Sequence, residues 1–266
     1  MLSNFHTHST YCDGKNTLEE IVLSAIEKGF SSLGFSGHGF TSFDSTYCMK
    51  ETDKYIAEIK ALREKYKKDI QLYIGVEEDA FYPLDHSPFD YVIGSSHYFN
   101  IDGTYYPVDS NPDCFKKCLE LFKGDVLNLA NSYYSAFCDY ILKHKPDIVG
   151  HFDLITKFDE MDASQFLENE KYNALAESFI KTAAKSGSLF EVNTGAISRG
   201  YRTSPYPAKN LLYTLKNEGA GLVLCSDSHA ADTLDCFFKE SRLMLKDIGF
   251  EYVYTLYNGE FVKDML

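Results

Sequence analysis

The chain has 266 residues, of which 44% are hydrophobic and 24% charged, so it can form one large α/β domain or two small ones. Its formal net charge is −13, and a diffuse acidic surface repels phosphate backbones, which excludes nucleic acid as an expected partner. No apolar run approaches the ~20 residues that a membrane span needs. A soluble protein without membrane association is therefore expected.

The cysteines indicate the expected compartment. There are seven, an odd number, and none forms a C-x-x-C pair. The first 20 residues lack a basic segment followed by an apolar one, which is the pattern of a secretory signal. Reduced thiols and a cytoplasmic location are therefore expected.

Short apolar segments alternate with amphipathic ones along the whole chain. The first amphipathic segment predicts a helix that begins after Thr17, with Glu20 completing a capping box, and ends at Gly29. Further helices are expected near 51–67, 113–144 with a break at Gly124, 166–186, from 207 to about 218, and 232–247. The apolar segments predict seven strands, at 2–6, 32–37, 70–76, 91–94, 147–150, 189–193 and 221–226, with a weak one near 251–256 and a loop at 98–112.

Strands that alternate with helices form a parallel sheet covered by helices. An open doubly wound sheet and a closed barrel both fit this order. Chemically active side chains follow almost every strand, as they do at the catalytic rim of a barrel, whereas an open sheet would collect them at one switch point. The barrel is therefore favoured, as a single domain over residues 1–266. These side chains are His6, His8, His38, Glu77, His97, His151, Asp227 and His229.

Six of the eight histidines stand at strand ends, and only His86 and His144, expected on the surface, do not. His6 and His8 alternate along one strand, so both rings lie on one face, and Asp13 follows in the next loop. Imidazoles with a nearby carboxylate suit a first-row divalent metal. Taken alone, the pair fits a surface accident equally well; the other strand-end ligands favour a metal site.

Ordered motifs stand at the strand ends: His6-Thr7-His8, Gly37-His38, Gly75-Val76-Glu77, Gly94-Ser95-Ser96-His97, Gly150-His151 and Ser226-Asp227-Ser228-His229. These motifs resemble those of the PHP (polymerase and histidinol phosphatase) superfamily, from residue 4 to about 230. The segments 94–99 and 190–195 are most similar to the histidinol-phosphate phosphatase branch. This resemblance implies a distorted (β/α)7 TIM-like barrel that hydrolyses L-histidinol phosphate in histidine biosynthesis, by attack of a hydroxide bridging two metals.

The same resemblance implies two or three divalent ions, zinc, manganese or iron. Glu77 would bridge the first and second ions. Some members carry a histidine where this chain has Asp13, which leaves the metal's identity open. The implied ligands are His6, His8, Glu77 and Asp227 for the first ion, Glu77, His97 and His151 for the second, and Asp13, His38 and His229 for the third.

Four further side chains are expected to contact the substrate. Arg199 and Arg202 share the loop after the sixth strand, and the planar guanidinium matches phosphate. Glu191 would either accept the substrate's ammonium group or support a ligand from behind. Phe99 would wall the imidazole or simply pack.

The leaving alkoxide needs a proton, for which Asp227 and His229 are both candidates. With Arg199, they form the expected catalytic set.

Two alternatives stay open at this stage. One is a sibling phosphoesterase acting on a nucleotide, a sugar phosphate or phosphotyrosine. The other is a catalytically silent metal-binding subunit of a larger assembly. The complete ligand set argues against this second alternative. The native metal and the oligomeric state are left open.

Overall fold

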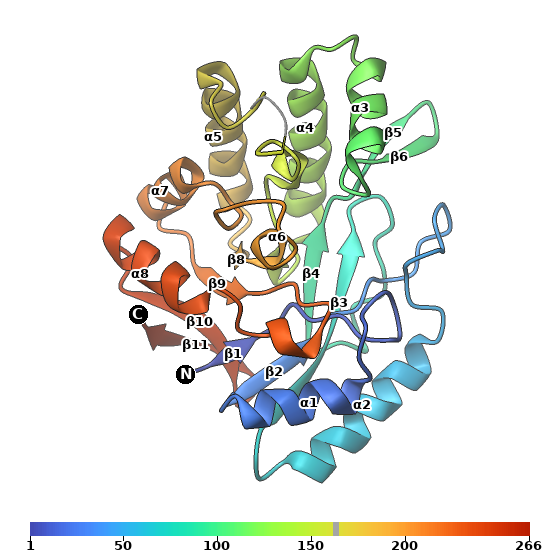
Figure 1. Cartoon of the computed structure of the whole chain (residues 1–266), viewed down its shortest axis with the longest axis vertical. Coiled ribbons are helices and arrows are strands. Elements are labelled where there is room, and N and C mark those ends of the chain that lie inside the picture. The colour runs from blue at the N-terminus through green and yellow to red at the C-terminus, as the bar shows by residue number, and fades with distance from the viewer. Residues whose placement is uncertain (162–164) are drawn as a thin grey trace.

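The computed structural model describes residues 1–161 and 165–266. Its main sheet has nine strands in the order β1-β2-β3-β4-β7-β8-β9-β10-β11, and neighbouring strands are parallel except for the final antiparallel pair (Figure 1). The strands are β1 (Ser3–Asn4), β2 (Ser32–Phe35), β3 (Gln71–Asp79), β4 (Tyr91–Ser95), β7 (Ile148–Val149), β8 (Leu189–Asn193), β9 (Leu222–Cys225), β10 (Tyr252–Tyr257) and β11 (Glu260–Met265).

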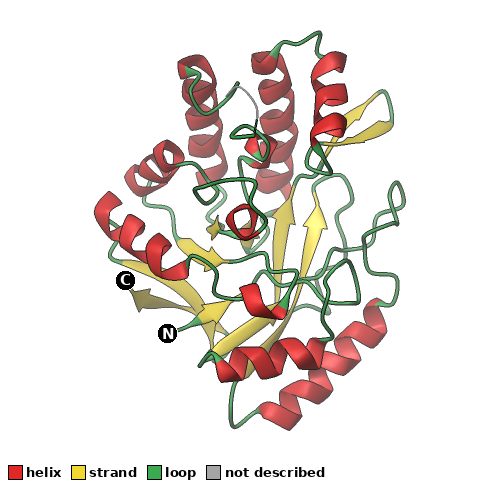
Figure 2. Ribbon diagram, viewed as in Figure 1, coloured by secondary structure: helices red, strands yellow, loops and turns green. Residues whose placement is uncertain are grey.

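Helices surround these strands (Figure 2). They are α1 (Leu18–Glu27), α2 (Thr52–Tyr66), α3 (Pro112–Leu121), α4 (Val126–His144), α5 (Glu170–Ala184), α6 (Gly195–Ser198), α7 (Lys209–Asn217) and α8 (Phe238–Ile248), with short 3-10 turns η1 (Leu154–Thr156) and η2 (Ala231–Thr233). The capping box at the start of α1 is confirmed, because Thr17 and Glu20 exchange both hydrogen bonds. Among the described residues, no helix combines the length and the apolar character needed to cross a bilayer.

The barrel closes between its first and seventh parallel strands. Beyond β1, Thr7 forms a parallel bridge with Ser228, which follows β9. The His8 amide donates to the Ser228 carbonyl at 2.8 Å, and the Ser228 amide donates to the His6 carbonyl at 3.2 Å. At the other end, β10 lies beside β1, where Thr255 donates to Ser3 at 2.8 Å. The predicted distorted TIM-like barrel is therefore confirmed, and β10 pairs with β9 as an additional parallel strand beyond the seven.

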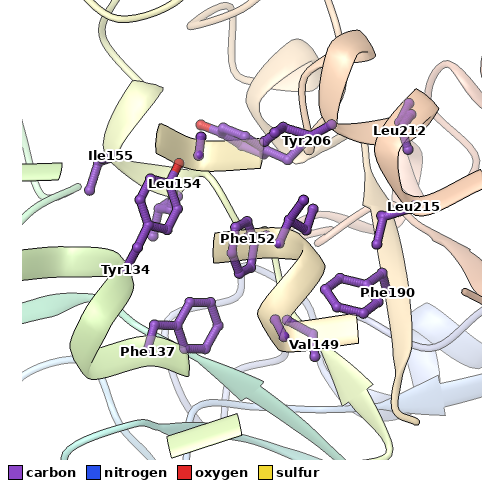
Figure 3. Close-up of a cluster of buried hydrophobic side chains, with 14 of the residues drawn as sticks. Tyr134, Phe137, Val149, Phe152, Leu154, Ile155, Phe190, Tyr206, Leu212 and Leu215 are labelled. Atoms are coloured by element: carbon purple, nitrogen blue, oxygen red, sulfur yellow. The ribbon is translucent and has the colours of Figure 1, made fainter. Parts of the chain in front are cut away.

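Apolar packing holds the barrel from inside and outside. Inside, Tyr91 fills the space over two glycines, since a Cβ on either Gly34 or Gly75 would lie 2.3 Å from its side chain. Outside, α4, α5 and α7 cover the sheet with an aromatic-rich cluster that includes Tyr134, Phe152 and Phe190 (Figure 3). This packing fixes the strands whose carboxyl ends bear the polar residues.

The structure contains two hairpins that were not predicted. The segment expected as a loop at 98–112 contains β5 (Tyr98–Ile101) and β6 (Thr104–Pro107), joined through Asp102 and Gly103. A similar turn at Asn258 and Gly259 joins β10 to β11. The strand β11 was not predicted. All four turn residues have positive φ, as Asp-Gly and Asn-Gly hairpin turns require, so the signal was present in the sequence.

Two predicted elements are shorter than expected. The first strand is only Ser3–Asn4 instead of 2–6, because beyond Asn4 the chain makes side-chain and bridge contacts around the site rather than a continuous ladder. The last helix begins at Phe238 instead of 232, since η2 precedes it.

Candidate metal centre

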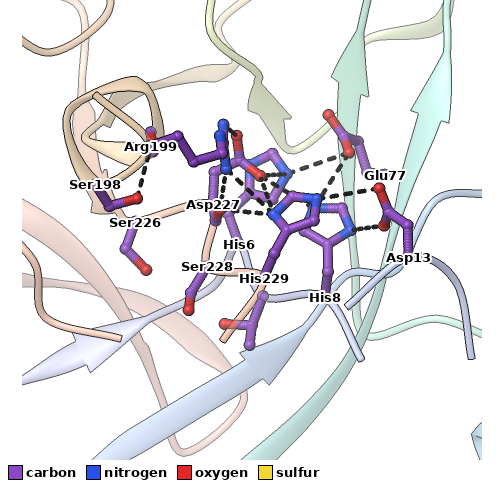
Figure 4. Close-up of polar contacts among 12 residues, drawn as sticks. His6, His8, Asp13, Glu77, Ser198, Arg199, Ser226, Asp227, Ser228 and His229 are labelled. Carbon is purple, nitrogen blue, oxygen red and sulfur yellow. Dashed lines mark hydrogen bonds and ion pairs between the residues drawn. The ribbon is translucent and has the colours of Figure 1, made fainter. Parts of the chain in front are cut away.

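The strand-end residues converge at the carboxyl edge of the barrel, where Figure 4 shows His6, His8 and Glu77 facing Asp227 and His229. Glu77 stands at the centre. Its two carboxylate oxygens lie between 2.9 and 3.6 Å from nitrogens of five imidazoles. These belong to His6, His8, His38, His97 and His151.

Two aspartates complete the cluster from opposite sides. Asp227 Oδ1 lies 3.1 Å from His8 Nε2 and 3.6 Å from both His6 Nε2 and His229 Nδ1. Asp13 Oδ2 lies 3.3 Å from His229 Nε2 and 3.7 Å from His38 Nε2. The structure therefore brings all nine sequence-predicted ligands together.

The possible ligand atoms form four overlapping groups, each with its members within 4.8 Å of one another. Glu77 belongs to two groups, which agrees with a bridging position. His8 belongs both to the group that contains Asp227 and to the group that contains Asp13. Its ring therefore lies between the predicted first and third metal sites. The groups are His8–Asp13–His38–His229, His6–Glu77–His151, His6–His8–Asp227 and His38–Glu77–His97.

Orphaned polar atoms show that the site fits metal ions. His6 Nε2, His8 Nε2 and Glu77 Oε2 are buried, and within the described residues they have no hydrogen-bond partner. Leaving such atoms unpaired is costly, whereas a divalent cation satisfies lone pairs from imidazole and carboxylate together. The donor set contains no cysteine and thus suits zinc, manganese or iron in an open site rather than a closed structural zinc site.

The protonation states suit ligands as well. Burial opposes the charge of Glu77, but His6, His38 and His97 hold its pKa well below the usual value. Burial likewise opposes the charge of Asp227, whose pKa is nevertheless lowered, foremost by Arg199. The two carboxylates are therefore ionised at neutral pH and can bind a cation.

Two neighbouring histidines respond to burial in opposite ways. Burial and the adjacent His229 and His38 lower the pKa of His8 to about 3, which leaves a neutral ring with a free lone pair. Burial also disfavours charge on His6, but Glu191 and Glu77 outweigh it and raise its pKa well above the usual value. A metal that binds His6 would displace a proton.

Buried carboxylates behind the rings orient them. Glu191 Oε2 lies 2.8 Å from His6 Nδ1, and its other oxygen accepts hydrogen bonds from the His151 amide and from Asn193. Asp79 Oδ2 accepts from the His97 amide at 3.0 Å and lies 3.4 Å from His97 Nδ1. Such partners direct the opposite ring nitrogen toward a metal. Of the two roles predicted for Glu191, this placement agrees with support from behind, since the residue is 1% exposed.

A cavity of about 350 Å³ opens above the cluster. Arg199 borders it and donates to Asp227 Oδ2 and to the Asp227 carbonyl, both at 2.8 Å. Lys157 also borders it and donates to the Asp109 carbonyl at 2.7 Å. The outer wall is completed by Asp44, Thr46, Tyr47, Tyr98, Ser110 and Tyr201.

Two predicted substrate contacts lie elsewhere. Arg202 is fully buried beneath the cavity wall and donates to Thr156, so the structure does not place it with Arg199. Phe99 is 3% exposed and packs against Phe122 and Tyr133. Along β5 the side chains alternate between faces, which turns Tyr98 toward the cavity and Phe99 toward the core.

Sequence reasoning missed Lys157, Tyr47, Asp44, Tyr98 and Asp109 as cavity residues. Lys157 had a usable signal, since it follows the strand-end His151 by six residues, within a loop of the catalytic rim. Tyr98 lies at the start of β5, within the segment 94–99 that carried the family resemblance, whereas Asp44, Tyr47 and Asp109 lie in loops without a recognisable motif.

The PHP domain model matches residues 4–195 of this chain, well over half of its length. The chain belongs to the PHP domain family. A Schizosaccharomyces pombe protein named "Probable histidinol-phosphatase" is 30% identical, over 92% of this chain and 86% of its own. The histidinol-phosphatase of Bacillus subtilis is 26% identical, over 85% of this chain and 92% of its own.

A solved structure shares the fold of this PHP protein. It is the histidinol phosphate phosphatase of Lactococcus lactis, complexed with zinc, L-histidinol and phosphate. It superposes with a TM-score of 0.75 at 21% identity, over 98% of both chains. The match of the PHP domain model to residues 4–195 confirms the predicted superfamily.

Proposed function

We propose that this chain is a metal-dependent phosphomonoesterase that hydrolyses L-histidinol phosphate to L-histidinol and phosphate. The observation that carries the proposal is the convergence of nine imidazole and carboxylate side chains, with Glu77 at their centre, at the base of a cavity walled by Arg199 and Lys157. A single domain over residues 1–266 would provide both parts.

The ligand set would hold two or three divalent ions of zinc, manganese or iron. The predicted division assigns His6, His8, Glu77 and Asp227 to the first ion, with the second and third as implied by the family. When bound, such ions supply an activated water and neutralise the oxygens of a phosphate group. The orphaned atoms of His6, His8 and Glu77 support this assignment.

Arg199 and Lys157 are the cations proposed to bind the phosphate. Arg199 offers a planar fork of donors, and Lys157 offers a compact point charge. Arg199 is held by Asp227, and Lys157 by Asp109, so both cations are positioned before a substrate arrives. Preorganised charge stabilises developing negative charge better than mobile charge does.

The outer wall supports a cationic, aromatic leaving group. Asp44 accepts a hydrogen bond from the Tyr98 hydroxyl at 2.8 Å, and Tyr47 lies with its ring edge-on to His38 at 4.7 Å between centroids. A carboxylate suits an ammonium group, and aromatic rings suit an imidazole. L-Histidinol carries both groups, and the relatives' names and the Lactococcus complex agree with this substrate.

Of the two predicted proton donors, His229 would protonate the leaving alkoxide, because the pKa of Asp227 is held well below its usual value and its carboxylate carries no proton at neutral pH. Both line the cavity, and His229 Nδ1 lies 3.0 Å from the Asp227 carbonyl and 3.2 Å from Arg199 Nη1. The alkoxide would leave on the side of the outer wall, within reach of His229.

Phosphate release from the purified protein tests the proposal, with zinc, manganese or iron added back and L-histidinol phosphate compared with nucleotide, sugar-phosphate and phosphotyrosine substrates. We expect the highest kcat/KM with L-histidinol phosphate. Faster turnover of another ester would make the chain a sibling phosphoesterase. Elemental analysis without bound metal, together with no turnover, would indicate a silent subunit.

A further inference from the structure

The chain buries a complete guanidinium group just outside the cavity. The side chain of Arg202 is 0% exposed, and its Cζ lies 4.4 Å from the ring centroid of Tyr206. Its Nη1 donates to Thr156 Oγ1 at 2.8 Å and lies 3.7 Å from Asp153 Oδ2, whose carboxylate is also 0% exposed. Burying two charges is costly and stabilises a fold little compared with apolar packing. This ion pair therefore calls for another explanation.

The partners of Arg202 belong to the loop that carries the second cation of the cavity. Thr156 directly precedes Lys157, and Arg202 follows Arg199 by three residues. The contact between Arg202 and Thr156 thus joins the two loops that supply the two cations.

Further contacts strengthen the same junction. The Ala208 amide donates to Asp153 Oδ2 at 3.0 Å. The Thr203 amide donates to Glu160 Oε2 at 2.8 Å. Each bond links the segment 153–160 to the segment 203–208, so the junction fixes both backbones over several residues.

The residue that precedes Arg202, Tyr201, contacts the cavity cation Lys157 directly. Lys157 Nζ lies 5.1 Å from the ring centroid of Tyr201, which precedes Arg202 and also lines the cavity. A shift of Arg202 would therefore move the surface against which Lys157 rests, as well as the backbone of both loops.

We propose that Arg202, Asp153 and Thr156 form a buried clamp that sets the spacing of Lys157 and Arg199, and with it the affinity for a phosphate dianion. Arg202 is a positioning residue that contacts no substrate. The inference rests on the proposed function, because it takes Lys157 and Arg199 as the phosphate-binding pair. Small displacements of binding groups weaken catalysis strongly, which is how the clamp acts at a distance.

The test compares Arg202→Met, Arg202→Lys and the double variant Arg202→Met/Asp153→Asn with the wild type. The double variant removes both buried charges, so it avoids an uncompensated carboxylate. The measurements are KM for L-histidinol phosphate, the inhibition constant of inorganic phosphate, bound metal and Tm. Arg242→Met is the matched control, since Arg242 pairs with Asp264 away from the cavity.

We expect the KM and the phosphate inhibition constant to rise about tenfold in Arg202→Met and in the double variant, the size of one lost charged contact. Arg202→Lys should recover part of this loss, and bound metal should stay at the wild-type level. The control should change neither constant. A clamp that only stabilises the fold would lower Tm and leave both constants of the folded protein within about twofold of wild type; that result would overturn the inference.

Two further experiments distinguish failure of the clamp from failure to fold and from failure of the proposed function. Thr156→Val removes one hydrogen bond and no charge, so it tests the clamp if the arginine variants fail to fold; an unchanged phosphate inhibition constant there would contradict the clamp. Calorimetric binding of inorganic phosphate to the metal-loaded protein needs no turnover. If the wild type hydrolyses no phosphomonoester, the proposed function fails, while weaker phosphate binding by Arg202→Met still supports the clamp.

Discussion

The base of the cavity and its outer wall are built in different ways. The base consists of side chains at or just after strand ends, directed by buried carboxylates such as Glu191 and Asp79. The wall consists of side chains from loops and the β5–β6 hairpin, including Lys157, Arg199 and Asp44. Rigid strands suit a metal site that tolerates little displacement, whereas loops can vary with the substrate. In the proposed enzyme, the base would therefore provide the reactivity and the wall the selectivity.

The largest expected effect comes from the centre of the base. Glu77→Gln removes the one charge shared by five imidazoles, so it should lower bound metal and reduce kcat by about 10³-fold or more. Elemental analysis and phosphate release measure both. The matched control is Glu78→Gln, because the neighbouring carboxylate faces Tyr140 and His86 instead. Loss of metal in the control as well would point to general damage.

The second prediction separates two ligands within the base. His8→Ala should strip the first metal, since the ring is fully buried and lies 3.1 Å from Asp227 and 3.6 Å from Glu77. Asp13→Ala should mainly loosen the third, because its side chain is 37% exposed and lies at the edge of the cluster. The amount of metal that each variant retains per chain during titration with a chelator distinguishes His8→Ala from Asp13→Ala. Equal loss of every metal in both variants would contradict the predicted division.

The third prediction concerns the wall's cations. Arg199→Met and Lys157→Met should each reduce kcat/KM by about 10- to 100-fold, because each removes one of the two charged contacts proposed for the phosphate. Bound metal should fall less than in Glu77→Gln. Steady-state kinetics with inorganic phosphate as inhibitor provide the measurement. If Arg199→Met and Lys157→Met lost as much metal as the base variants do, the proposed difference in role between base and wall would be wrong.

The smallest effect is expected at the outer edge of the wall. Asp44→Asn keeps the size of the side chain that contacts Tyr98 and Thr46, but removes its charge. The KM for L-histidinol phosphate should rise by about threefold to tenfold, in line with one partly exposed ion pair. The KM for phenyl phosphate, which has no ammonium group, should not change. A parallel rise for both substrates would remove Asp44 from leaving-group recognition.

The sequence by itself determined most of the base. Parallel strands bring their carboxyl ends to one rim, so His6, Glu77 and Asp227 could be placed together from strand order alone. The spacing of hydrophobic residues predicted most of the helices and parallel strands, because this spacing is a short-range property of the sequence. The two hairpins were missed although Asp-Gly and Asn-Gly marked their turns.

Only the tertiary structure decided the wall. Arg199 and Arg202 share one loop and the same chemistry, yet one borders the cavity while the other is buried beside Asp153. Which of them borders the cavity depends on how this loop packs against the segment 153–160, through contacts between residues that are 43 and 46 positions apart in the sequence. Such contacts leave no periodic trace in the sequence, because they arise only when the barrel brings the two loops side by side.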